Sequence, residues 1–287
     1  MTDLASPVSQ LERAHQEWLA RLRLGYARVA GRTALVRREH LGPLRVQRPF
    51  YPEGPEVCHA YLIHPPAGIA AGDRIEAEVH LAAGAHALIT TPGAAKWYRS
   101  AGEWATQDVQ LTVGPDACLE WLPQEAILFR GARAAMQLRV DLTPGALFLG
   151  WEITCFGRTA SGERFDDGEL RQRIDVAISG SPLWHEQTRL EGGARLFRSP
   201  AGLRGYPVTG LLLAAGRDVG AHLLDACRAI RSGDDALCGV STMPGVLAAR
   251  YLGRSTEDAR HYFRALWRVL RPELVHRPAC APRIWNT

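Results

Sequence analysis

The feature that most constrains the fold of this chain is an alternation of apolar and polar residues with a period of two. In segment 20–26, apolar side chains alternate with Arg21 and Arg23. Successive side chains of a strand point to opposite faces of a sheet, so this pattern predicts strands that are buried on one face. Further strands are expected at 33–39, 75–81, 136–142 and 170–178.

Turns rich in glycine and proline separate these segments, at 65–68, 83–84, 92–93, 114–116, 144–145 and 166–168. Short strands joined by such turns are typical of all-β architectures. The sequence contains no repeat of fixed period and no GxGxxG motif, which disfavours propellers and dinucleotide-binding folds. We therefore predict a mainly β protein with a coiled or layered sheet, either β-helix-like or sandwich-like.

Beyond Gly220 the pattern becomes helical. A short helix is expected near 222–230, and Ser255 is a suitable N-cap for a longer helix that runs to about Leu270. No low-complexity linker separates helices from strands. We expect a flexible or helical lead at 1–17 and a single domain at 18–287, divided into a β-rich part (18–220), a small helical part (221–275) and a tail (276–287).

Composition and charge narrow the function classes. The 34 basic and 30 acidic residues are mixed along the chain without a run of like charges, so nothing calls for a nucleic-acid partner. The first residues lack the apolar core of a secretory signal, and no apolar stretch approaches the roughly 18 residues of a membrane span. A cytoplasmic chain without membrane contact is expected.

The sequence offers only weak metal donors. The six cysteines lie far apart without a CxxC, and HExxH and HxH motifs are missing. Cys58, His59 and His64 are candidates, but a gap of five does not place both histidines on one face of a strand. No tight metal site is predicted. The segment 178–182 does not form a GxSxG elbow, which argues against an acyl-transfer enzyme.

Acidic residues stand in or beside the turns of the β-rich part: Asp73, Glu120, Glu125, Glu152, Glu163, Asp166, Asp167 and Glu169. These carboxylates could pass a cation from site to site, or they could pair with the many arginines. Residue types and spacing leave both interpretations open.

Several long segments, in order, resemble the urease accessory protein D family, also called H in some organisms. They are GPLRVQRPFYPEG (42–54), CHAYLIHPPAGIAAGDRI (58–75), LITTPGAAKWYRS (88–100), LEWLPQEAILFRGA (119–132), FGRTASGERF (156–165) and PRIW (282–285). The resemblance covers the chain from about residue 18 to its end. One departure is Ala71, which stands where the family pattern has the first of two glycines before Asp73.

The resemblance implies a non-enzymatic scaffold for urease maturation. Its expected partners are apo-urease, a second accessory protein (F type) and a nickel-carrying GTPase (G type). No tightly bound cofactor is implied, only nickel ions in transit along an internal path. Such a path requires weak ligands in series, because a tight site would trap the ion.

On this interpretation four carboxylates are candidates for the nickel path: Asp73, Glu125, Glu152 and Glu163. Arginine and aromatic side chains often anchor protein interfaces. They identify Trp97, Tyr98, Arg99, Arg283 and Trp285 as candidate partner contacts, and Trp184 fits the same profile.

Two other functions remain as alternatives. A metal-dependent hydrolase on a β scaffold would require three or more clustered ligands. A carbohydrate-binding β-sandwich would present exposed aromatic platforms and would need no protein partner.

Overall fold

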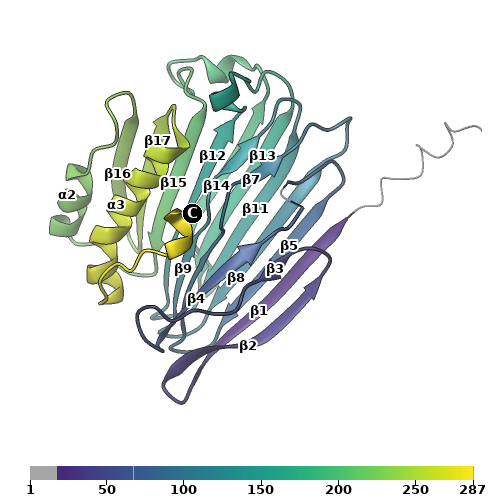
Figure 1. Cartoon of the computed structure of the whole chain (residues 1–287). Coiled ribbons are helices and arrows are strands. Elements are labelled where there is room, and N and C mark those ends of the chain that lie inside the picture. The colour runs from purple at the N-terminus through teal and green to yellow at the C-terminus, as the bar shows by residue number, and fades with distance from the viewer. Residues whose placement is uncertain (1–17, 67, 287) are drawn as a thin grey trace, which may run out of the picture.

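The computed structural model describes residues 18–66 and 68–286, so the lead predicted at 1–17 lies outside the described residues. Two large sheets pack face to face, as Figure 1 shows. The seven-stranded sheet has the order β14-β13-β11-β8-β5-β1-β2 and consists of β1 (Leu19–Val29), β2 (Arg32–Leu41), β5 (Arg74–Leu81), β8 (Ala105–Val113), β11 (Arg133–Leu142), β13 (Glu169–Ile178) and β14 (Ser181–Glu191).

The ten-stranded sheet has the order β16-β17-β15-β12-β9-β6-β4-β3, with β10 and β7 attached beside β12. Its strands are β3 (Arg45–Val46), β4 (Val57–Ile63), β6 (His86–Thr90), β7 (Ala95–Trp97), β9 (Cys118–Leu122), β10 (Ala126–Leu128), β12 (Leu147–Phe156), β15 (Val208–Ala215), β16 (Leu237–Met243) and β17 (Val246–Gly253). All five strands expected from alternation are present, and the prediction of a mainly β fold is confirmed.

The middle of the chain winds as a coil. From β4 to β13 the main strands alternate between the two sheets, and neighbours in each sheet pair in parallel, as in β5–β8–β11–β13 and β4–β6–β9–β12. Successive turns also stack, because a Cβ on Gly145 (φ +81°) would meet the carboxylate of Asp116 in the turn below. The fold is therefore β-helix-like in its chain path and sandwich-like in its layers.

Parallel register aligns inward residues into ladders across the seven-stranded sheet. Val79, Leu111, Val140 and Val176 form one such ladder, and all four are buried. Burying these branched side chains supplies the main stabilisation of the coil. The ladder that begins at Ile75 differs, because it continues through Gln107, Met136 and Gln172 and so places two amides between the sheets.

Helices cover the outer face of the ten-stranded sheet. α2 (Ala221–Ala229) and α3 (Thr256–Val275) pack against β12, β15, β16 and β17 and enclose a second apolar core (Figure 1). Ser255 accepts a hydrogen bond from the Asp258 amide and caps α3, as the sequence predicts. The part expected to be helical, 221–275, also contains strands β16 and β17, so that expectation was incomplete: this hairpin pairs with β15 and extends the sheet.

Three short 3-10 turns complete the described structure: η1 (Thr159–Ser161), η2 (Arg195–Phe197) and η3 (Arg283–Asn286). Within the described residues, no helix is both long enough and apolar enough to cross a membrane.

Candidate functional site

A cavity of about 390 Å³ lies between the two sheets. The ladder that begins at Ile75 forms one wall through Gln107 and Met136. The ten-stranded sheet forms the other wall through Trp121 and Glu152. Most of the lining is apolar. The cavity therefore interrupts the core at the place where inward positions of the strands carry amide and carboxyl groups.

Glu152 is a half-buried charged residue of the cavity lining. It lies on β12 with its side chain between the sheets, on the same face as Phe148 and Phe156. Its one recorded hydrogen bond comes from Trp121 Nε1 at 3.3 Å, and within the described residues no basic side chain forms an ion pair with it. Burial without a charged partner raises the pKa of Glu152 to about 7.

A second, smaller cavity of about 170 Å³ lies on the other side of Glu152. Gln172, Thr154, Thr188 and Thr209 supply polar atoms to its wall, and the ion pair between Glu186 and Arg250 borders it. Glu152 lines both cavities. Among their lining residues, Glu152 is the one that the two cavities share.

His64 lines the larger cavity, and Asp73 lies near His64. His64 is half-buried, and burial lowers its pKa although the nearby Asp73 opposes the shift. A neutral imidazole is the form that binds a metal. Asp73 itself accepts a hydrogen bond from the Ala70 amide at 2.7 Å, which fixes the turn that the sequence predicts there.

The other two carboxylates predicted for the path are held by arginines. Glu125 is buried and forms an ion pair with Arg260 of α3. Glu163 pairs with Arg158 at 2.6 Å and accepts a hydrogen bond from a backbone amide. Of the four candidates, only Glu152 is among the residues that line these two cavities.

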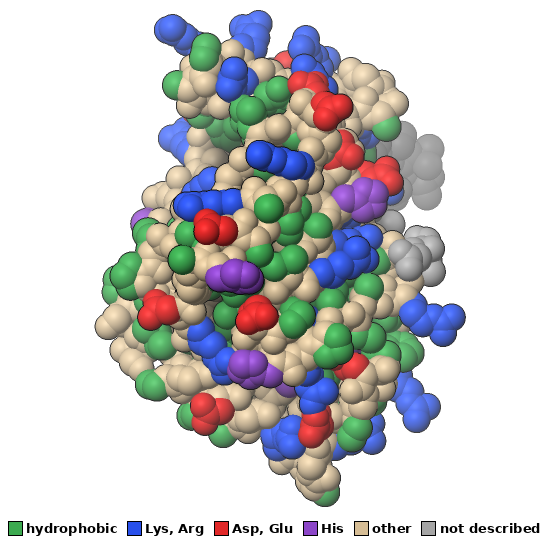
Figure 2. All heavy atoms as spheres, turned by 90° about the vertical axis from the view of Figure 1, so that its left-hand side faces the viewer, with side chains coloured by type: hydrophobic (Ala, Val, Ile, Leu, Met, Phe, Trp, Pro, Cys, Tyr) green, Lys and Arg blue, Asp and Glu red, His purple; other side chains and the backbone are tan. Residues whose placement is uncertain are grey.

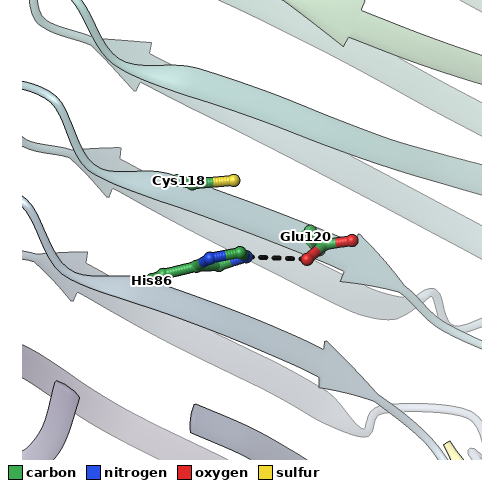
Figure 3. A group of neighbouring side chains, drawn as sticks. All are labelled: His86, Cys118 and Glu120. Atoms are coloured by element: carbon green, nitrogen blue, oxygen red, sulfur yellow. Dashed lines mark hydrogen bonds and ion pairs between the residues drawn. The ribbon is translucent and has the colours of Figure 1, made fainter. Parts of the chain in front are cut away.

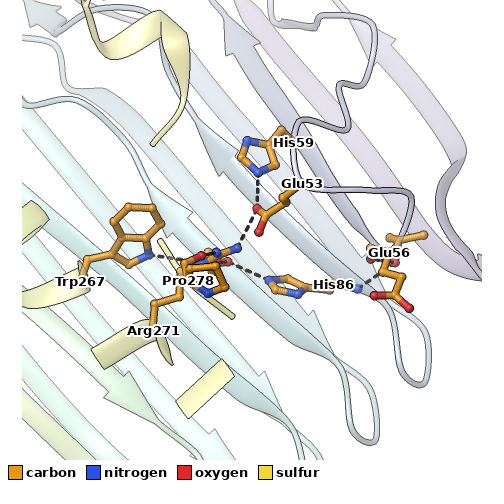
Figure 4. Close-up of polar contacts among 9 residues, drawn as sticks. Glu53, Glu56, His59, His86, Trp267, Arg271 and Pro278 are labelled. Atoms are coloured by element: carbon orange, nitrogen blue, oxygen red, sulfur yellow. Dashed lines mark hydrogen bonds and ion pairs between the residues drawn. The ribbon is translucent and has the colours of Figure 1, made fainter. Parts of the chain in front are cut away.

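A second buried carboxylate, Glu120, lies on the opposite face of the same sheet, under α3. Arg271 Nε lies 3.1 and 3.0 Å from its two oxygens, Trp267 Nε1 donates at 2.6 Å, and His86 Nε2 is 2.7 Å away. Arg271 also reaches Glu53, which contacts His59 (Figure 4). Burial alone would raise the pKa of Glu120, but these partners lower it to about 2.

His86, Cys118 and Glu120 bring three metal-ligating atoms within 4.8 Å of one another (Figure 3). These residue types could hold a borderline metal. The oxygens of Glu120, however, already accept hydrogen bonds from three side chains, including a guanidinium that would repel a cation. We interpret the cluster as a buried ion-pair network that fastens α3 to the sheet.

The three donors suggested by the sequence are separated. Cys58 points into the core between the sheets, where burial raises its pKa to about 11, whereas His59 points to the opposite face and contacts Glu53 at 2.7 Å. His64 lies at the cavity described above. These residues do not form one site.

The predicted partner contacts lie in different environments. Tyr98, Arg99 and Arg283 are exposed. Trp97 is 1% exposed and lies in the core, so its ring offers no surface to a partner. Trp285 packs against Trp151 and Trp267 and donates a hydrogen bond to Thr90, which anchors the tail beside α3.

Trp184 is half-buried, with Arg250 over its ring. Sequence reasoning missed the network around Arg271, whose members are spread from residue 53 to residue 271. For the cavity, a signal does exist: Gln107 and Gln172 occupy inward positions of alternating strands.

Sequence comparison with known proteins identifies the family of this chain. The profile of the family described as "UreD urease accessory protein" matches residues 19–286. The urease accessory protein UreD of Methylobacillus flagellatus is 48% identical over 274 residues, covering 96% of each chain. That of Azoarcus sp. is 48% identical over 283 residues (98% of this chain and 99% of the relative), and that of Dechloromonas aromatica is 49% identical over 284 residues (98% of each).

Coverage of nearly the whole length excludes a match limited to one shared segment. This chain belongs to the urease accessory protein UreD family.

Proposed function

We propose that this chain is a non-catalytic cytoplasmic scaffold that conducts nickel to apo-urease. In this proposal the ion comes from a nickel-carrying GTPase through a second accessory protein. It passes between the two sheets by way of Glu152. Nickel is cargo here, and the chain keeps no tightly bound cofactor.

The observation that carries the proposal is the position of Glu152 between two cavities without a charged partner. A buried carboxylate normally has an arginine or lysine beside it, as Glu120 and Glu125 have. An unpaired one stabilises a cation that passes. A single carboxylate with amide and water oxygens is also a weak ligand set, which lets the ion leave again.

His64 and Asp73 fit the same role. His64 is neutral at physiological pH and supplies a nitrogen donor at the larger cavity, with Asp73 nearby to attract a cation. The amides of Gln107 and Gln172 supply oxygens on either side of Glu152. Glu125 and Glu163 are neutralised by arginines, so we leave them outside the path.

The experiment is nickel transfer in a purified system of apo-urease, both accessory proteins and the nickel-loaded GTPase. With Glu152→Gln, we expect the nickel content of urease after a fixed time to fall about tenfold, while the complex still assembles. Glu163→Gln is the matched control and should transfer nickel normally. Normal transfer by Glu152→Gln, with assembly intact, would rule out this path.

A further inference from the structure

The loop at residues 192–207 connects β14 to β15 and is longer than most connections within a compact domain. It contains Arg195, Arg198 and Arg204 and no acidic residue. Its only regular element is the 3-10 turn η2 (Arg195–Phe197). Loops of this length without secondary structure of their own usually serve a function.

Beside this loop lies the most voluminous of the pockets described, about 870 Å³. The loop, the segment around η1 and the beginning of α3 surround it. Phe156, Phe165 and Phe197 form its apolar floor, with ring centroids 5.2 to 6.1 Å apart. A pocket floored by aromatic rings can accept an apolar side chain from outside.

The rim of the pocket carries unused positive charge. Arg164 and Arg198 line it, and Arg195 and Arg204 lie nearby on the loop. All four are exposed, and none forms an ion pair within the described part of the chain. Figure 2 shows basic and hydrophobic side chains, with acidic ones beside them, at the top of the molecule, the end where the η1 and η2 loops lie in Figure 1.

The acidic residues of the rim do not balance this charge. Glu163 is paired with Arg158, and Asp166 is paired with Arg130. Glu257, in the first turn of α3, is the acid of the lining that has no ion pair among the described residues. Among the residues that line the pocket, two arginines without an ion pair (Arg164 and Arg198) therefore face one such carboxylate, and Arg195 and Arg204 on the loop outnumber the nearby Asp167.

The loop also exposes an apolar side chain beside the pocket. Leu196 is 45% exposed and lies between Arg195 and Phe197, and Phe197 is half-buried and lines the pocket. Arginine and large apolar side chains around a pocket are the composition of energetically dominant interface residues. Free arginines would add charge-assisted hydrogen bonds to carboxylates.

We propose that this pocket is the docking site for an acidic segment of a partner protein, with one apolar side chain of that segment inserted against the phenylalanine floor. The positive charge of the rim favours acidic residues in the partner segment, and the phenylalanine floor favours the apolar side chain that the segment inserts. A nucleic acid fits less well, because phosphate binding requires basic residues spread along a groove, whereas these surround one apolar pocket.

The proposal does not depend on the nickel path, since none of the residues altered in its test (Arg164, Arg198 and Leu196) lines either cavity beside Glu152. The two features are nevertheless close. Phe156 lines both this pocket and the smaller cavity, and Leu203 of the same loop lines that cavity as well. A partner docked in this pocket would lie next to the smaller cavity.

The test is fluorescence anisotropy with the full chain and short labelled peptides. The probes are EELEELEE, its leucine-free counterpart EESEESEE and the charge-reversed KKLKKLKK. We expect EELEELEE to bind at least about tenfold more tightly than either of the others, and its affinity to fall as salt rises. The double variant Arg164→Ala/Arg198→Ala should weaken binding of EELEELEE about tenfold.

Arg38→Ala/Arg48→Ala is the matched control, because both arginines are exposed and form no ion pair in the described structure, far along the chain from this pocket. It should bind like the unaltered chain. Leu196→Ser, a surface change, should reduce the preference for EELEELEE over EESEESEE.

Three results would overturn the proposal. They are equal binding of EELEELEE and EESEESEE, equal losses in the two double variants, and a single-stranded oligothymidine that competes with EELEELEE and binds more tightly. Absence of binding by EELEELEE at millimolar concentration would overturn it as well.

Discussion

The two faces of the ten-stranded sheet each carry a glutamate, and the surroundings of the two carboxylates are opposite. Glu120 is fully buried, whereas Glu152 is half-buried and lines two cavities. On the helix side, Glu120 accepts hydrogen bonds from three side chains, and its pKa falls to about 2. On the side facing the other sheet, Glu152 has a single long hydrogen bond, and its pKa rises to about 7. The carboxylate of Glu120 thus stabilises the fold on one face, whereas the carboxylate of Glu152 on the other face is free to bind a cation.

The difference shows how to separate structure from function among buried charges. A charge that the fold has already paired holds elements together and has nothing left to bind. A buried charge without a partner lowers stability, so it persists where something outside the protein uses it. The largest expected losses of stability lie on the helix side of the sheet, because breaking an ion pair there leaves buried charges without a partner.

The strongest test of this comparison is Arg271→Met. Arg271 is fully buried and contacts both Glu120 and Glu53, so its loss leaves two carboxylates without their shared cation. We expect the free energy of unfolding to fall by about 3–5 kcal/mol. Denaturant unfolding at neutral pH measures it.

The control for this experiment is Arg23→Met, which breaks the partly exposed pair with Glu78. Such pairs contribute little, so its unfolding midpoint should stay nearly unchanged. Equal midpoints for Arg271→Met and Arg23→Met would mean that the network does not fasten α3.

Glu152→Gln should act in the opposite direction. The folded-state pKa of Glu152 lies near 7 and the ordinary value is 4.5, so the folded protein loses stability as pH rises through this window. Glutamine carries no such penalty. We therefore expect the free energy of unfolding of Glu152→Gln to be about 2 kcal/mol higher than that of the unaltered chain near pH 8.5. This value is smaller than the full pKa shift would give, because the cavities can hold water.

Below about pH 4.5 this gain should disappear, since Glu152 is then neutral in both states. Unfolding curves at several pH values measure the difference between the two proteins. A gain that does not change with pH would show that the amide improves packing and that the charge of Glu152 has no part in it.

Glu125→Gln also tests the difference between carboxylates paired within the fold and carboxylates on the proposed nickel path. Its carboxylate pairs with Arg260 and accepts a hydrogen bond from Thr256 at 3.3 Å, both on the first turns of α3. We expect a loss of about 1–3 kcal/mol of stability, because a partly buried arginine is left without its anion. Nickel loading of urease, measured by metal analysis, should remain normal; a loading defect without loss of stability would place Glu125 on the path.

The fold was largely predictable because it depends on local periodicity. Alternation located five strands of the seven-stranded sheet, and Ser255 located the start of α3. The hairpin β16–β17 was missed: three consecutive β16 residues, Leu237–Gly239, are exposed, so its buried face shows little alternation. The pattern of an edge strand is weaker than that of a strand between two neighbours.

The candidate site was predictable only in part. Asp73 and Glu152 were found as acids within family motifs, but nothing in the sequence tells that Glu125 meets Arg260, 135 residues away, while Glu152 meets no arginine. Ion pairing between distant segments depends on how the coil and the helices pack. The structure was therefore needed to show which of the four candidate carboxylates pair with an arginine and which do not.

The finest test concerns the one donor that Glu152 retains. In Trp121→Phe the carboxylate loses the indole N–H at 3.3 Å, which removes a stabilising contact from its charged form only. We expect the pKa of Glu152 to rise by roughly half a unit to one unit, the equivalent of a weak hydrogen bond. The absolute stability also falls because a smaller ring leaves a void, so the readout must be the pH dependence.

That readout is the difference in unfolding free energy between Trp121→Phe and the double variant Trp121→Phe/Glu152→Gln, followed across pH. The void is common to both proteins and cancels, which leaves the titration of Glu152 alone. A midpoint displaced to higher pH than in the matching pair with Trp121 intact would show that Trp121 limits how strongly the carboxylate holds a proton. An unmoved midpoint would mean that the burial between the two cavities alone sets the pKa, and that Trp121 only fills space.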